Sequence, residues 1–259
     1  MISMKHLLYM IALLATSALT SCMNNDNGER EGILILKPVS SSNFSSTEFE
    51  DVNQLRYIPT QAIMTPPESE LAWVHFKYNQ HDLYNNNKSI NIDLLNQPIY
   101  IRQEYMEQNL PEYMEGNEHS LYACSGQMWG MDYLLLDITM FVNKDTPNDE
   151  LLEEVKHQHN LTLYYDVTEE SRYNVLELQL RYQINGGEVS EDNLRKYTKE
   201  FNDIRYFKIK DVLEEYKQVN GELPSTIKIK YYKSRQAQAN IVTDTWRPET
   251  IDVQLEGGY

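Results

Sequence analysis

Two histidines, His157 and His159, have a spacing that is typical of metal ligands. They stand two positions apart, so on a β-strand their side chains would point to the same side and could share one ion. Two imidazoles supply only half of a tetrahedral zinc site, and the sequence fixes no cysteine or carboxylate beside them. The simpler interpretation is the exposed end of a surface strand, so we predict no metal site and no cofactor.

Adjacent acidic residues are a second pattern that could do chemistry, because glycoside hydrolysis needs two carboxyl groups roughly 5 to 10 Å apart across a cleft. Neighbouring residues point in different directions, however, and a chain with 39 acidic residues contains such pairs by chance. The sequence also lacks the common nucleotide-binding, serine-nucleophile and zinc-protease motifs. We therefore predict that the protein is not an enzyme, and a hydrolase with an unrecognised carboxylate pair is the second alternative. The adjacent pairs include Glu153 with Glu154, Glu169 with Glu170, and Glu214 with Glu215.

Cys22 has the most specific sequence context in the chain. The segment before it begins with a lone basic residue and continues into an apolar stretch shorter than the ~20 residues that a membrane-spanning helix needs. Leu19, Thr20 and Ser21 before the cysteine match the bacterial lipobox, after which a signal peptidase cuts and the thiol is acylated. At about 0.8 kcal/mol per buried methylene, two or more acyl chains would hold a folded domain on a bilayer. We predict that residues 1–21 are a lipoprotein signal peptide; the alternative is a plain signal peptide cleaved elsewhere.

Cys124 is the only other cysteine, so acylation of Cys22 would leave it without an intrachain disulfide partner. It lies in the apolar, strand-like run 121–124, which predicts a small buried residue rather than a nucleophile. The stability of the exported chain must therefore come from packing.

The composition indicates a globular protein, with one large or two ordinary domains in 259 residues. The 39 acidic and 23 basic residues give a net charge of -16. This charge repels phosphate backbones, so we expect no nucleic-acid partner. An acidic exterior favours a cationic ligand such as an antimicrobial peptide.

The aromatic residues suggest an alternative ligand. The chain has 19 tyrosines but only 6 phenylalanines, and tyrosine suits both a binding face and a half-buried strand. Trp73, Trp129 and Trp246 are candidate stacking platforms for a sugar, although core packing is the simpler interpretation of the first two. A glycan-binding accessory lipoprotein is therefore the first alternative function.

Short strand-like runs between turn residues fill the first part of the mature chain, residues 31–105. The clearest run, 71–78, alternates apolar and polar side chains as a half-buried strand does. Five or so strands in about 75 residues predict a small barrel or sandwich. The preceding residues 22–30 are polar and predict a flexible tether.

The alternation sharpens beyond the polar segment 103–118, which we interpret as a domain boundary. Repeated two-sided strands over 118–235 predict an antiparallel β-sandwich. Two helical insertions are expected there, one beginning at the N-cap residue Ser190 and one over 212–221. Residues 236–259 are interpreted as a polar tail.

A characteristic pattern of strands and turns runs through this second domain: residues 129–136, a loop to His157, the strand 161–165, and residues 176–182 followed by Asn185 and Gly186. Proline-flanked strands at 55–59 and 73–78, with Pro66 and Pro67 between them, accompany it in the first domain. Together these features resemble the NigD-like lipoproteins, a Bacteroidales-type family.

The resemblance implies a mainly β fold, with an OB-like barrel followed by an antiparallel, immunoglobulin-like β-sandwich with short helical insertions. It also implies an envelope lipoprotein with a bacteriocin-associated, immunity-like role, and it supplies no catalytic residues. The segments 190–201 and 212–221 and the polar tail depart from the family pattern. We therefore expect a non-catalytic binding or structural module, anchored to the outer membrane through acylated Cys22, whose partner is a peptide or another envelope protein.

Overall fold

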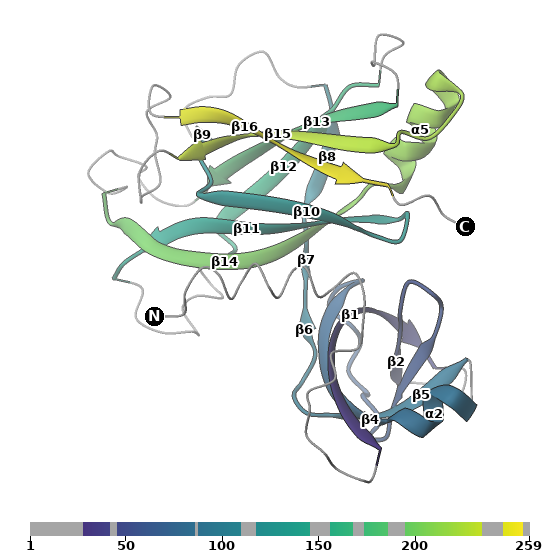
Figure 1. Ribbon diagram of the computed structural model, residues 1–259. Coiled ribbons are helices and arrows are strands. Elements are labelled where there is room, and N and C mark those ends of the chain that lie inside the picture. Colours follow the sequence, from purple (N-terminus) through teal and green to yellow (C-terminus); the bar gives the residue numbers. More distant parts are fainter. Residues whose placement is uncertain are drawn as a thin grey trace. The chain divides into compact units, whose positions relative to one another are not determined.

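The computed structural model describes residues 28–41, 46–85, 88–109, 118–145, 156–167, 174–185, 195–234 and 246–255. The fold is mainly β, with a small barrel and a sandwich, as predicted (Figure 1). It divides into two compact units, one ending at Ile101 and the other beginning at Arg102. None of the helices within the described ranges is long and apolar enough to span a membrane. The predicted signal peptide and the predicted lipobox lie outside these ranges.

The first unit is a closed five-stranded barrel. Its strands follow the order β1-β2-β3-β5-β4, and β4 pairs back onto β1. Only β3 and β5 run parallel, which is the Greek-key arrangement of an OB-like barrel and confirms the expected fold. A short strand, β6, extends the pairing of β4. The elements are β1 (Glu29–Ser40), β2 (Thr47–Glu50), β3 (Arg56–Pro59), β4 (Ala72–Asn79), α2 (Gln80–Asn85), β5 (Ser89–Leu94) and β6 (Ile99–Tyr100).

Alternation along β4 determines which side chains fill the barrel. Ala72, Val74 and Phe76 are buried in its core, while the residues between them face outward. At the other end of the barrel, β1 starts at Glu29, so the predicted tether is wrong for Glu29 and Arg30. These two residues pair with the end of β4, and the ladder hydrogen bonds order them despite their polarity.

The second unit is a sandwich of two sheets. One sheet has the order β10-β11-β14-β7, and the other has the order β16-β15-β13-β12-β8, with β9 paired to β13. Three pairs are parallel, β7 with β14, β8 with β12 and β13 with β15, so the sandwich is mixed rather than wholly antiparallel. The strands are β7 (Arg102–Gln103), β8 (Tyr105–Gln108), β9 (Glu118–His119), β10 (Ala123–Trp129), β11 (Tyr133–Asn143), β12 (His159–Tyr165), β13 (Val175–Ile184), β14 (Tyr197–Lys208), β15 (Thr226–Ser234) and β16 (Trp246–Gln254).

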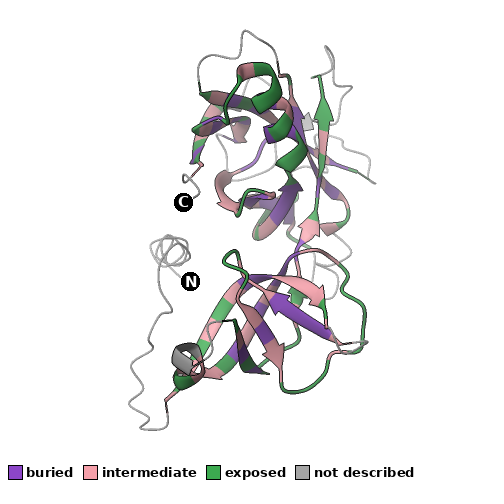
Figure 2. Cartoon of the chain, turned by 90° about the vertical axis from the view of Figure 1, so that its right-hand side faces the viewer, coloured by how far each residue is buried: buried purple, intermediate pink, exposed green. Residues whose placement is uncertain are grey.

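The sandwich core contains the apolar face of each predicted strand. Leu134, Leu136 and Ile138 of β11 face Leu176 and Leu178 of β13, among other buried residues. Figure 2 shows this burial along the strands, whereas much of the helix Lys210–Asn220 is exposed. The first two strands of the unit, β7 and β8, lie mostly within the polar segment 103–118, which the sequence predicts to be a domain boundary. They are short, but pairing with β14 and β12 attaches them to the sandwich.

One of the two predicted helices is present. Helix α5 (Lys210–Asn220) buries Val212, Leu213 and Tyr216 and ends at Gly221, whose φ of 85° is one that glycine adopts without strain. The helix predicted from Ser190 to residue 201 is wrong over 195–201, where a turn leads into β14, while Ser190 itself lies outside the described residues. Pairing with β11 along the strand outweighs the local helix signal there.

The predicted polar tail is wrong for Trp246–Gln254, which form β16 and pair with the whole of β15. The sequence of this segment is polar because Thr250, Asp252 and Gln254 alternate with Ile251 and Val253, as expected of an edge strand with one buried face. Val253 reaches the core, and a Cβ at Gly126 of β10 would lie 2.8 Å from Val253 Cγ2. Glycine at position 126 therefore permits the close approach of β10 to β16.

Candidate functional site

The three tryptophans predicted as stacking platforms occupy different places. Trp73 on β4 and Trp129 on β10 are both half-buried, and the Trp129 ring packs against Tyr133 at a centroid distance of 5.6 Å. Trp246 begins β16, but its side chain lies outside the described residues, as does Cys22 with its lipobox. Stacking of a sugar on these rings stays a prediction.

Cys124 lies on β10, where its side chain is partly buried against the sandwich core. Burial raises the pKa of its thiol, and the carboxylate of Asp137 raises it further. A thiol that resists ionisation is a poor nucleophile. The site therefore agrees with the structural interpretation of this cysteine.

The two histidines with metal-like spacing do not share a face. His157 is exposed in a turn, whereas His159 is buried at the start of β12, with its Nδ1 atom 2.5 Å from the hydroxyl of Tyr182. Burial lowers the pKa of His159 to about 3, and nearby Arg205 adds to the shift. The prediction of a surface strand end is thus wrong for His159, which is a neutral core residue. Throughout the described ranges, no group of three or more potential ligands is placed to hold a metal ion.

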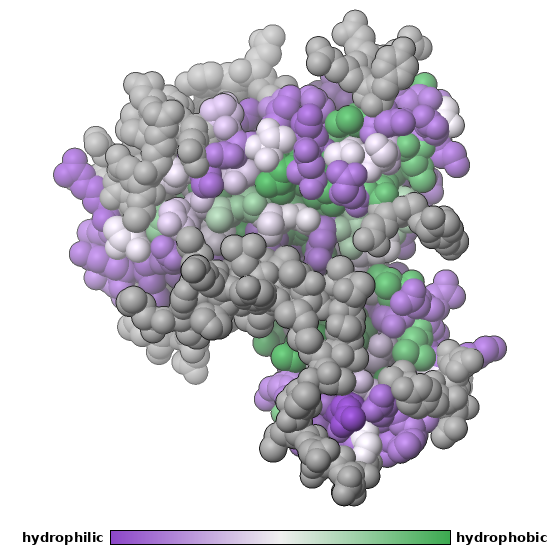
Figure 3. All heavy atoms as spheres, in the orientation of Figure 1, coloured by the Kyte–Doolittle hydropathy of each residue, from purple (hydrophilic) through white to green (hydrophobic). Residues whose placement is uncertain are grey.

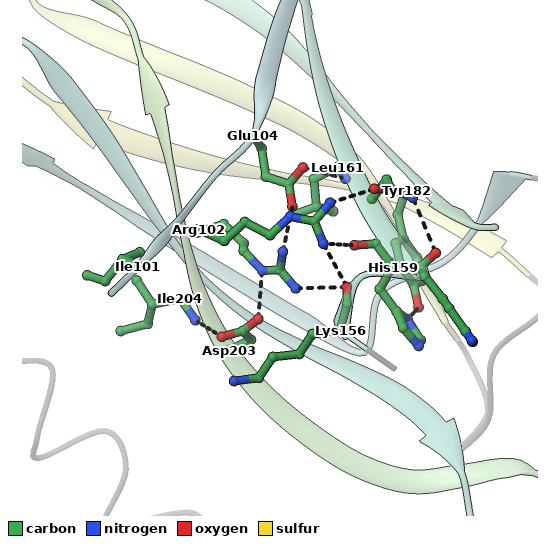
Figure 4. Close-up of polar contacts among 12 residues, drawn as sticks. Ile101, Arg102, Glu104, Lys156, His159, Leu161, Tyr182, Asp203 and Ile204 are labelled. Atoms are coloured by element: carbon green, nitrogen blue, oxygen red, sulfur yellow. Dashed lines mark hydrogen bonds and ion pairs between the residues drawn. The ribbon is translucent and has the colours of Figure 1, made fainter. Parts of the chain in front are cut away.

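A buried polar network surrounds Arg205 of β14, and Figure 4 shows its neighbours Arg102, Glu104 and Asp203 together. The Arg205 side chain is 0% exposed, and its Nη1 atom lies 2.7 Å from Oε1 of Glu104, which is itself 1% exposed. Its Nε atom donates to Oδ2 of Asp203 at 2.6 Å. We call these residues, together with Arg102, the Arg205 cluster.

Arg102 contacts the same oxygen of Glu104, with 3.3 Å between Nε and Oε1. Its two terminal nitrogens donate to the carbonyl oxygen of Lys156 at 2.8 Å and to Oδ1 of Asn160 at 2.6 Å. Glu104 is the residue at which the chain passes from β7 in one sheet to β8 in the other. The Arg205 cluster therefore attaches this crossing to β14 and to the beginning of β12.

Charge in the Arg205 cluster is compensated internally. Burial raises the pKa of Glu104, while the positive charges of Arg205 and Arg102 act in the opposite direction. Burial also lowers the pKa of Arg102, and Glu104 opposes that shift. One oxygen of the Glu104 carboxylate contacts two guanidinium groups. Such a paired carboxylate is poorly suited to accept a proton as a general base. We therefore assign the cluster a structural role.

Sequence reasoning did not identify the Arg205 cluster, although a weak signal was present. Asp203 and Arg205 lie between Phe201 and Phe207 at every second position of β14, so two charged residues occupy core-facing positions of a strand. Buried charges need partners. The partner Glu104, however, is about a hundred residues earlier in the chain, which no local pattern reveals.

A cleft with a volume of about 250 Å³ lies next to Glu104, between β8 and the start of α5. Tyr105 is exposed at its rim and Tyr165 is half-buried. Burial raises the pKa of Tyr165, and the negative charges of Glu215 and Asp211 raise it further. The cleft therefore combines phenol rings with the carboxylates of Asp211 and Glu215 and with one lysine, Lys208. Its lining residues are Gln103, Glu104, Tyr105, Met106, Tyr165, Lys208, Asp211 and Val212.

Of the three acidic pairs named above, the structure describes one. Glu214 and Glu215 lie on α5, where Glu214 is exposed and Glu215 accepts a hydrogen bond from Gln108 Nε2 at 3.2 Å. The other two pairs lie outside the described residues.

Comparison of the sequence with protein-family models gave no match, and comparison with curated proteins also gave none. Solved structures do match the fold. A candidate lipoprotein from Bacteroides fragilis aligns with a TM-score of 0.71 and 16% identity, over 88% of this chain and 99% of that one. A protein of unknown function from Bacteroides vulgatus aligns with a TM-score of 0.56 and 15% identity, over 88% and 92%.

A NigD-like immunity protein from Bacteroides caccae is also among the matching structures, with a TM-score of 0.49, 16% identity, and coverage of 85% of this chain and 91% of that one. Of the structures named here, the one with the TM-score of 0.71 is a candidate lipoprotein, which is the kind of protein that the sequence resemblance named. At these identities the likeness is one of fold, and on that basis the chain shares its architecture with a candidate lipoprotein of Bacteroides.

Proposed function

We propose that this chain is a non-catalytic lipoprotein of the cell envelope, anchored to the outer membrane through acylated Cys22 and acting as a binding module with an immunity-like role. The observation that carries the proposal is the lipobox Leu19-Thr20-Ser21-Cys22 at the end of a short apolar segment. The fold shared with a candidate lipoprotein supports it.

Labelling with radioactive palmitate tests the anchor, and the two cysteines provide a matched pair of variants. We expect label in the wild-type protein and in Cys124→Ser, because Cys124 is partly buried in a strand. Cys22→Ser should carry no label and should not be retained in the detergent phase of a phase-separation assay, since the acyl chains are lost. Unlabelled mature protein free in the medium would exclude the proposed anchor.

We assign the partner contact to the cleft beside Tyr105, because exposed aromatic surface lies there next to the carboxylates of Asp211 and Glu215, which outnumber the one lysine of its lining, Lys208. Hydrophilic residues also predominate on much of the described surface in Figure 3. A net charge of -16 would attract a cationic partner and repel an anionic one. The partner class that fits is therefore a cationic peptide or a basic segment of another envelope protein.

Titration of the mature chain with an oligolysine peptide tests this assignment. We expect binding at low salt that weakens as salt rises, because exposed charges are screened. Asp211→Asn, at the cleft, should weaken binding about threefold, the scale of one exposed charge pair. Asp252→Asn is the matched control. Asp252 is also exposed, but it lies on β16, and β16 and the cleft strand β8 form opposite edges of one sheet. Equal effects of the two variants would remove the cleft from the proposal.

A further inference from the structure

The outer face of the barrel carries a row of apolar side chains across three strands. Trp73 of β4 pairs with Ile35 of β1 on one side and with Ile99 of β6 on the other. Directly opposite residues on neighbouring strands face the same side of a sheet. Ala72 and Val74 fill the core, so Trp73 and its two partners face outward. We call this row, together with Ile33 on β1, the Trp73 patch.

Two members of the Trp73 patch extend well into solvent. Ile99 is 66% exposed and Ile33 is 52% exposed, while the Trp73 ring is half-buried and Ile35 is only 6% exposed. Ile33 lies beside His75, the next outward-facing residue of β4 after Trp73. Single exposed apolar residues are normal on protein surfaces, but neighbours in register form a continuous patch, which marks a contact surface.

The charges that border the Trp73 patch are balanced. Glu31, Lys77 and Asp93 form a row across β1, β4 and β5, two residues beyond His75. Lys37 lies two residues beyond Ile35 on β1. Two lysines therefore accompany two carboxylates, in contrast to the strong negative charge of the whole chain. A contact at this patch would depend on apolar burial more than on charge.

The length of chain before β1 indicates what the Trp73 patch contacts. Only about seven residues separate Cys22 from Glu29, so the start of β1 can lie at most ~25 Å from the acylated residue. Ile33 is four residues into the strand, roughly 14 Å from its start. An anchor at Cys22 thus places the patch within reach of the bilayer surface.

We propose that the Trp73 patch rests on the lipid bilayer, with the indole of Trp73 at the level of the headgroups. This inference depends on the proposed acylation of Cys22, which supplies the attachment. Tryptophan is suited to this depth because its ring is apolar and its N–H can remain hydrated. The patch orients the anchored barrel, and the balanced charges around it make zwitterionic lipid sufficient.

Fluorescence quenching in vesicles tests the proposal on the acylated full mature protein. We expect brominated phosphatidylcholine to quench a component of the tryptophan emission that is absent from Trp73→Phe. Ile99→Ser should reduce that quenching at least twofold, because it removes apolar surface from the patch. Met64→Ser is the matched control: Met64 is also 66% exposed but lies in the segment between β3 and β4, and this variant should quench like the wild type.

The outcomes separate the patch from the anchor. Acylated protein that stays on the vesicles while Trp73 is not quenched would overturn the patch and leave the anchor intact. Protein that carries no acyl group would overturn the anchor. In that case the unacylated mature chain still tests the patch, because partition to phosphatidylcholine vesicles should fall about tenfold in a Trp73→Ser, Ile99→Ser double variant. A dimer in solution that Ile99→Ser dissociates would show that a second copy covers the patch, and would also overturn the proposal.

Discussion

The barrel and the sandwich each place one arginine between two carboxylates, in opposite environments. Arg56 of the barrel lies 3.1 Å from Glu48 and 3.7 Å from Glu50, and its side chain is 39% exposed. Arg205 of the sandwich makes shorter contacts in complete burial. Water screens the first arrangement and competes with it, whereas the second exists only because the buried charges compensate one another. Ion pairs of the same kind therefore contribute differently to the stability of the two units.

The largest effect is expected for Arg205→Met, which keeps an apolar side chain of similar length and removes the charge. Glu104 would retain Arg102 but would lose its shorter, fully buried partner. Breaking a buried pair by removing one partner costs about 3–5 kcal/mol of unfolding free energy. Urea unfolding combined with amide hydrogen exchange assigns the loss to the sandwich. A loss below about 1 kcal/mol would show that Arg205 does not stabilise the unit.

A smaller net effect is expected for the double variant Arg205→Met, Glu104→Leu. Removing both charges leaves no fully buried carboxylate without its partner, and only Asp203, whose side chain is 16% exposed, still loses its contact with Arg205. Apolar replacements of buried ion pairs are often neutral. We expect the double variant to recover most of the stability that Arg205→Met loses, measured in the same urea titration. If the second substitution recovers nothing, the loss came from packing around Arg205 and not from uncompensated charge.

Local patterns predicted the elements whose apolar residues recur at the regular spacing of a strand or of a helix. The strand around Leu134 and Ile138 and the helix ending at Gly221 are both confirmed, because each of them buries a face that its own sequence displays. The barrel was also predictable as a class, since its short strands and turn residues recur at close spacing. Its closure, by contrast, depends on β1 pairing with β4, a contact between residues far apart in the chain.

The elements that were missed are those in which polar residues take structural positions. Strand β16 looked like a tail because an edge strand exposes one face, so half of its residues carry no apolar signal. Glu104 looked like part of a polar boundary, although it is buried, because its partner Arg205 comes from a strand distant in sequence. The proposed lipidation of Cys22 differs from both, because it depends on a short motif that the sequence alone displays.

The smallest effect is expected for Arg56→Met, which is the matched counterpart of the change at Arg205. Exposed pairs contribute about 0–1 kcal/mol, and the partial exposure of Arg56 places this substitution in that range. The loss should shrink further at 1 M salt, where charges more than about 3 Å apart are screened, whereas the loss at Arg205 should change little. Unfolding of both variants at low and high salt measures this difference. Equal salt dependence at the two sites would mean that water reaches Arg205, and the distinction between the buried and the exposed cluster would then fail.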